Sequence, residues 1–160
     1  MATNKISRAG HVRFYQGLAA VLVGVALNHF GDRLLGVQIE LYRGLQGFGG
    51  MWIVDMFLLP FIVGFVVALI FGFGGRWLSY FPPMIVRMIS YYEIAYVTGV
   101  PQGASLLPLG WWGFFVILVV ESSAFGGIIG EVIIKGNYGR SPRHKVYKEK
   151  SSNSGSDIEA

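Results

Sequence analysis

Acidic side chains within strongly apolar stretches are the residues of this sequence most able to carry chemistry. They are Asp55, Glu93 and Glu121. Ionisable groups are costly inside a bilayer, so where they occur they usually mark an ion path or a paired contact. With His29, which lies near the end of an earlier apolar run, they could form a proton or cation path, or a metal site built on His29 and Asp55. The structural alternative is that each acid is neutral or bonded to a neighbouring helix and only fixes packing or a subunit contact.

Other chemistries find little support in the residue types. The chain has no cysteine and three histidines, so it lacks the ligand clusters that hold transition metals or haem. No histidine stands in a context suited to a Ser-His-Asp arrangement. The glycine-rich 72–75 follows an apolar run rather than a buried strand, which argues against a phosphate loop. We expect a chain that is not catalytic on its own and has no cofactor of its own. A metal or pigment shared with another subunit remains an alternative.

The composition is typical of a membrane protein. Hydrophobic residues make up 53% of the chain and charged residues only 14%, against roughly 25% in soluble domains. The apolar residues form blocks long enough to cross about 30 Å of hydrocarbon as helices. The net charge of +4 comes from the two ends of the chain, so it indicates topology rather than nucleic-acid binding. The predicted class is therefore an all-α integral membrane protein.

Three parts are predicted along the chain: a basic leader (1–13), a transmembrane bundle (14–134) and a basic C-terminal tail (135–160), disordered or held by a partner. The clear spans are 14–30, 51–73 and 111–134. A cleavable signal peptide is the competing interpretation of the first span. The apolar run continues into further membrane-like sequence, which favours a retained anchor. Charges interrupt 31–50, which is predicted to be a short interfacial helix.

The two basic ends decide the expected number of spans. Lys and Arg favour the cytoplasmic side, so both termini are predicted to be cytoplasmic, at a plasma or inner membrane. An even number of crossings then requires a fourth span, for which 84–100 is the best candidate, although Arg87 and Glu93 would be costly at the bilayer centre. Arg87 is predicted to snorkel inward or, alternatively, to pair with an acid of a partner. If 84–100 instead lies along the interface, the bundle has three spans plus an interfacial helix.

Small residues recur at helical spacing in the clear spans, a pattern that lets helices approach closely. The predicted packing residues are Gly17, Ala20, Gly24, Gly64, Ala68, Gly72, Ser122, Gly126 and Gly130. Interface anchors are predicted at the span ends. They are Trp52, Trp77, Trp111, Trp112 and Lys135. Glu131 is expected to pair with Lys135 one helical turn on, and Pro60 is expected to kink the second span.

These features favour a small integral subunit with a structural or assembly role in a larger membrane complex of the respiratory, photosynthetic or membrane monooxygenase type. Its expected partners are other integral membrane subunits and lipids, and no nucleic acid. The alternative is a small homo-oligomeric transporter or channel for protons, cations or small molecules, with the acids as its path. Glu121 is central to either hypothesis, because a carboxylate at mid-span should face protein or an internal water.

Overall fold

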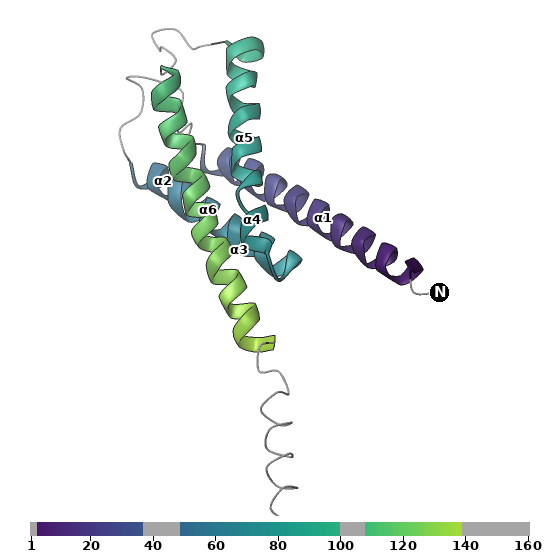
Figure 1. Cartoon of the computed structure of the whole chain (residues 1–160). Helices are drawn as coiled ribbons and strands as arrows, with labels where there is room; N and C mark the ends of the chain where they lie inside the picture. Colours follow the sequence, from purple (N-terminus) through teal and green to yellow (C-terminus); the bar gives the residue numbers. More distant parts are fainter. Residues whose placement is uncertain (1–2, 37–48, 100–107, 139–160) are drawn as a thin grey trace, which may run out of the picture.

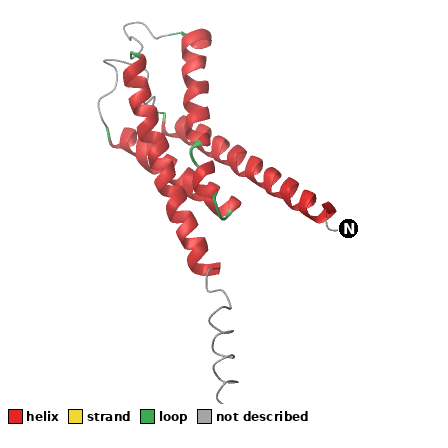
Figure 2. Cartoon of the chain, in the orientation of Figure 1, coloured by secondary structure: helices red, strands yellow, loops and turns green. Residues whose placement is uncertain are grey.

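The computed structural model describes residues 3–36, 49–99 and 108–138, and the regular elements within these ranges are all helices (Figure 2). Three described helices are long and apolar enough to cross a membrane: His11–Leu35, Gly50–Phe71 and Leu109–Gly136. The expected class, an all-helical membrane protein, is confirmed by this architecture. The predicted fourth span is not among the three.

The first helix, α1 (Thr3–Leu35), is longer than the sequence pattern indicates. It begins within the predicted leader, so much of that leader is helical rather than a separate polar segment. It also continues past the predicted end at residue 30 and includes Asp32 and Arg33. The reason is that 14–35 contains no proline or paired glycine to stop a helix, so a change in polarity alone does not end it. Most of the predicted interfacial helix 31–50 lies outside the described residues.

The second span is one helical rod with a wide turn near its start. It consists of α2 (Gly50–Ile53), a π-helical turn η1 (Val54–Leu58) and α3 (Leu59–Phe71). Pro60 follows this turn directly. A proline cannot donate a backbone hydrogen bond, and its ring clashes with a carbonyl in the preceding turn. The wider turn relieves that conflict and holds Asp55 and Met56 in buried positions.

The end of α3 corrects one packing prediction. Gly72 follows Phe71 with a φ of +83°, and a Cβ added to it would meet nothing within 4 Å. This residue therefore does not extend the packing stripe of Gly64 and Ala68. It ends the helix, because a positive φ is readily adopted by glycine.

The chain then turns through α4 (Gly75–Leu78) into α5 (Phe81–Tyr92), which continues as the π-helical η2 (Glu93–Thr98). Pro82 and Pro83 lie in the first turn of α5, where the missing N–H groups leave no helical hydrogen bond unmade. The two prolines therefore lie at the start of a helix and do not interrupt it. Figure 1 shows α5 running beside one half of the last helix, α6 (Leu109–Tyr138). The remainder of the predicted C-terminal tail lies outside the described residues.

The closest helix contact is between α3 and α6. A Cβ on Gly64 would overlap the carbonyl oxygen of Ser123, and a Cβ on Gly126 would overlap that of Phe61. At Gly130 the added Cβ would lie 2.9 Å from the Cβ of Ala68. The two backbones therefore touch, as small-residue stripes permit.

Two serine hydroxyls of α6 donate hydrogen bonds to the segments on either side of α3. Ser122 donates to the carbonyl oxygen of Phe57 at 2.6 Å, and Ser123 donates to that of Ser79 at 2.7 Å. Hydrogen bonds of this kind between membrane helices contribute about 0.6 kcal/mol each on average. In the structure, Gly126 and Gly130 of the predicted stripe contact α3, and Ser122 bonds to Phe57 in η1, so the stripe lies against the second span of the same chain.

The stripe on α1 is used in the same way. Ala20 is fully buried in a core cluster with Val63 and Val67. A Cβ on Gly17 would lie 3.2 Å from the Leu78 and Phe71 side chains, and one on Gly24 would lie 2.7 Å from Pro82. The small-residue faces of the clear spans are therefore occupied within one chain.

The predicted tryptophan anchors fall into two groups. Trp77 and Trp111 are mostly exposed, as interface anchors should be. Trp52 instead packs edge-on against Phe115, beside the buried Met56 and Val119. Trp112 lies against Tyr91 with ring centroids 5.0 Å apart. These two inward-facing rings join α6 to α2 and to α5.

Candidate functional site

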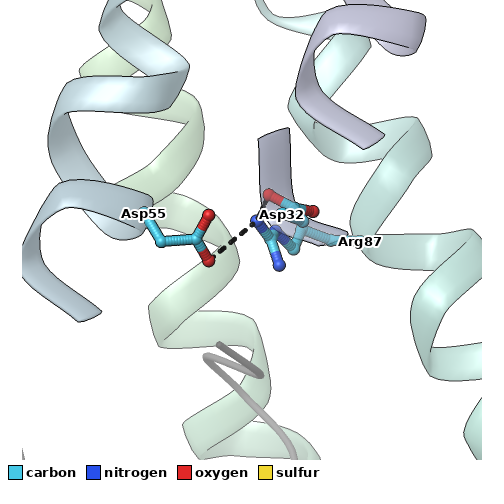
Figure 3. Close-up of polar contacts among 3 residues, drawn as sticks. All are labelled: Asp32, Asp55 and Arg87. Atoms are coloured by element: carbon cyan, nitrogen blue, oxygen red, sulfur yellow. Dashed lines mark hydrogen bonds and ion pairs between the residues drawn. The ribbon is translucent and has the colours of Figure 1, made fainter. Parts of the chain in front are cut away.

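A buried arginine lies where three helices meet. Arg87 of α5 is 2% exposed, and its Nη2 atom donates a hydrogen bond of 2.8 Å to Oδ1 of Asp32 on α1. The same nitrogen lies 3.8 Å from Oδ2 of Asp55 in η1 (Figure 3). Asp55 is fully buried. We call Asp32, Asp55 and Arg87 the ion cluster.

Each member of the ion cluster reaches it through a local feature of its helix. Asp32 is there because α1 continues beyond its predicted end. Asp55 lies in the π-helical turn before Pro60. Arg87 follows the prolines of α5 by little more than one turn, so the direction in which α5 starts sets its position. Asn28 is also fully buried on α1, one turn before Asp32 and on the same face.

The ion cluster links three helical segments, α1, η1 and α5. One guanidinium between two carboxylates balances one negative charge directly, and the second carboxylate lies close enough to share it. Buried charges persist only when paired, because an isolated ion in a low-dielectric interior is very costly. No group of three or more metal-ligating side chains occurs among the described residues. The predicted snorkelling of Arg87 is therefore wrong: its acids lie within the chain and come from α1 and η1.

The other predicted polar residues are not members of the ion cluster. Glu93, at the start of η2, has a half-exposed side chain 3.8 Å from Nη2 of Arg33. Exposed pairs of this kind contribute little to stability. His29 is partly buried and lies edge-on to Phe30. Within the described part of a single chain, the predicted polar track of His29, Asp55, Glu93 and Glu121 is therefore not continuous.

Glu121 lies on the outer surface of α6. It is exposed, and it forms no hydrogen bond or ion pair with any described residue. Ile117 and Phe125, one turn away on either side, are 61% and 63% exposed. The apolar residues at helical spacing around the carboxylate form what we call the Glu121 face. They are Phe114, Ile117, Phe125, Ile128 and Val132.

The Glu121 face lies beside the stripe that packs on α3, as expected from a rotation of about 100° between helical neighbours. Ser123, Gly126 and Gly130 are buried, whereas Glu121 is not. The prediction that Glu121 faces a polar partner therefore has no counterpart among the described residues of one chain.

The remaining predicted pair is confirmed. Oε1 of Glu131 lies 3.0 Å from Nζ of Lys135, one helical turn apart near the end of α6. This pair combines a buried acid with a half-exposed lysine at the end of the membrane-spanning segment. It explains the presence of Glu131 by structure alone.

Sequence reasoning missed Asp32 and Ser79. Asp32 falls within 31–50, the range predicted as an interfacial helix, although its spacing from Asn28 puts both polar residues on one helical face. Arg87 was a second signal, since a cation within an apolar segment requires acids nearby. Ser79 gave no signal, because it acts through its backbone carbonyl oxygen. No protein-family model, curated protein or solved structure matches the chain.

Proposed function

We propose that this chain is a small integral subunit with a structural or assembly role in a larger membrane complex of the respiratory, photosynthetic or monooxygenase type. Exposed Glu121, in the middle of an apolar helix face, is the observation that carries the proposal. A charged side chain near the centre of a membrane helix costs about 2.5–3.5 kcal/mol on insertion scales. Contact with a polar group of a neighbouring subunit removes most of that cost.

The rest of the bundle supports the same proposal. The ion cluster pairs Arg87 with Asp32 and places Asp55 beside it, and Gly24, Gly64 and Gly126 contact neighbouring helices of the chain. Among the described residues, Glu121 is thus the mid-span ionisable group that is left for another molecule to accommodate. The partner that fits this face is a transmembrane helix that is apolar over most of its length and has one donor group, such as an amide, hydroxyl or cationic side chain, opposite Glu121.

Substitution of Glu121 tests whether the Glu121 face contacts another subunit. Glu121→Gln keeps the size and hydrogen bonding of the side chain, so assembly should persist. Glu121→Leu removes the polar contact and should weaken assembly by about 1 kcal/mol, or roughly fivefold in the dissociation constant. Gentle solubilisation followed by native electrophoresis measures the assembled fraction.

The matched control is the pair Glu93→Gln and Glu93→Leu, at an acid that already has Arg33 beside it. Both control variants should assemble like the wild type. Migration of the wild-type chain solely as a monomer or homodimer would contradict the proposed role. Equal assembly of the wild type and Glu121→Leu would show that Glu121 is not at the interface.

The alternative function is a homo-oligomeric transporter or channel for protons, cations or small molecules. The two buried or partly buried carboxylates around Arg87 favour it, since a membrane carboxylate can take up and release a proton. Proton flux in liposomes, compared between the wild type and Glu121→Gln, separates the two functions. Absence of flux in correctly inserted wild type rules out the proton path.

We also propose four crossings with both termini cytoplasmic. The 12 residues of α5 and the 6 of η2 form a continuous helical segment, close to the roughly 20 residues that a span requires. Arg87 would make this span costly to place in a membrane if it were unpaired. Its pairing with Asp32 and Asp55 lowers the cost of burying its charge.

The topology is open to a direct test, because the chain has no cysteine. Asn4→Cys and Ser151→Cys, made separately, should both be protected from a membrane-impermeant maleimide in intact cells and be labelled after permeabilisation. Labelling of one terminus alone in intact cells would establish an odd number of crossings.

A further inference from the structure

We propose that a groove beside the first half of α1 binds an anionic phospholipid, with an acyl chain in the groove and the phosphate on Arg13. The groove has a volume of about 570 Å³. Arg13, Gly17 and Leu18 line it from α1, and Phe71, Leu78 and Phe81 line it from the junction of α3, α4 and α5. This inference does not depend on the proposed role of Glu121.

The shape of the groove follows from the way α1 leaves the bundle. At Gly17 the absent side chain lets Phe71 and Leu78 approach the helix, so that a Cβ there would lie 3.2 Å from both. Towards its N-terminus α1 diverges from the other helices (Figure 1). The gap between them is walled by exposed apolar side chains, among them Phe14 and Leu18. Such a surface matches an acyl chain.

The positive charge of Arg13 indicates that the lipid headgroup is anionic. Arg13 is the charged residue among those that line the groove, and it stands two residues from the start of the membrane-spanning segment His11–Leu35. An arginine near the end of a span can extend its guanidinium towards the lipid headgroups. Arg13 has no ion pair with a described residue. A guanidinium binds phosphate oxygens through two parallel N–H groups, so Arg13 can hold a phosphodiester without losing another partner.

The size of the groove suits a narrow apolar ligand. A single extended acyl chain is much narrower than a protein helix, which is about 10–12 Å in diameter with its side chains. The volume lies in the range of roughly 300–1,000 Å³ that is common for small-molecule pockets.

Lipid retention tests the site. The full-length protein is placed in nanodiscs of phosphatidylcholine doped with phosphatidylglycerol, and bound lipid is counted by native mass spectrometry after release. The wild type should retain phosphatidylglycerol in preference to phosphatidylcholine. Arg13→Gln should reduce that preference about fivefold, the effect of one cationic contact near a membrane surface. Leu18→Trp, at a half-exposed position, should narrow the groove and reduce retention of both lipids.

Arg33→Gln is the matched control, since it removes the same charge from the same helix away from the groove. It should leave the preference unchanged. Equal retention of the two lipids by the wild type would overturn the proposal. An equal effect of Arg13→Gln and Arg33→Gln would also overturn it, because general surface charge would then explain the binding. Unchanged retention in a folded Leu18→Trp variant would exclude the groove as the acyl-chain site.

Discussion

Replacement of Arg87 by methionine is expected to destabilise the chain by about 3–5 kcal/mol, the cost of breaking a buried ion pair by removing one partner. Asp32 and Asp55 would remain between the helices without the guanidinium that lies 2.8 and 3.8 Å from them. Their charges would have to be quenched by protonation or by water entering the bundle. Reversible unfolding with SDS in mixed micelles, followed by tryptophan fluorescence, measures the loss.

A compensated variant shows whether the loss comes from uncompensated charge. Combining Arg87→Met with Asp32→Asn and Asp55→Asn removes all three charges while keeping similar side-chain volumes. This triple variant should recover most of the lost stability, because neutral groups in the same positions carry no ionic desolvation cost. A triple variant no more stable than Arg87→Met would show that Arg87 acts through packing alone.

Substitution of Gly126 by alanine is expected to separate α3 from α6. The new methyl group would overlap the carbonyl oxygen of Phe61, a backbone atom that cannot rotate away. Overpacking of this kind typically costs about 1–3 kcal/mol, and occasionally more. The same SDS titration should show an earlier midpoint for Gly126→Ala.

Gly113→Ala is the control on the same helix. A Cβ there would meet nothing within 4 Å, so only helix propensity changes, which favours alanine by up to about 1 kcal/mol. The two variants should therefore move the unfolding midpoint in opposite directions. Equal shifts would show that the α3–α6 crossing is looser than its geometry indicates.

Much of the fold was predictable because hydrophobic length and small-residue spacing are local signals. The second and third clear spans coincide closely with Gly50–Phe71 and Leu109–Gly136, and Gly126 and Gly130 on α6 are buried. The end of α1 was not predictable in this way. Its polar residues Asp32 and Arg33 resemble a connection until the acids and cations of other helices are placed beside them.

The candidate site, too, could be predicted only in part from the sequence. Sequence alone identified Asp55, Glu93 and Glu121 as intramembrane acids, but not which of them is neutralised and which is left exposed. That difference depends on the rotation of each helix about its axis. For Asp55 this rotation is changed by a π-helical turn, whose presence follows from Pro60 but whose extent does not. Glu121 and the buried Ser123 are two positions apart and lie on nearly opposite sides of α6, about 200° apart around the helix, so the rotation of α6 about its axis decides which of them is buried.

The π-helical turn η1 also changes which side of the second span faces the bundle before and after the turn. A π turn contains about one residue more than an α turn, so the helix before it is rotated relative to an uninterrupted α-helix by about 100°. The early part thereby directs Asp55 and Met56 inward, while the later part directs Val63 and Val67 towards α1. A one-residue deletion within 54–58 would convert the π-helical turn into a regular α-helical turn. The residues before it would then rotate and turn Asp55 away from Arg87. The number of residues in this short turn is therefore constrained as well as the identity of Asp55.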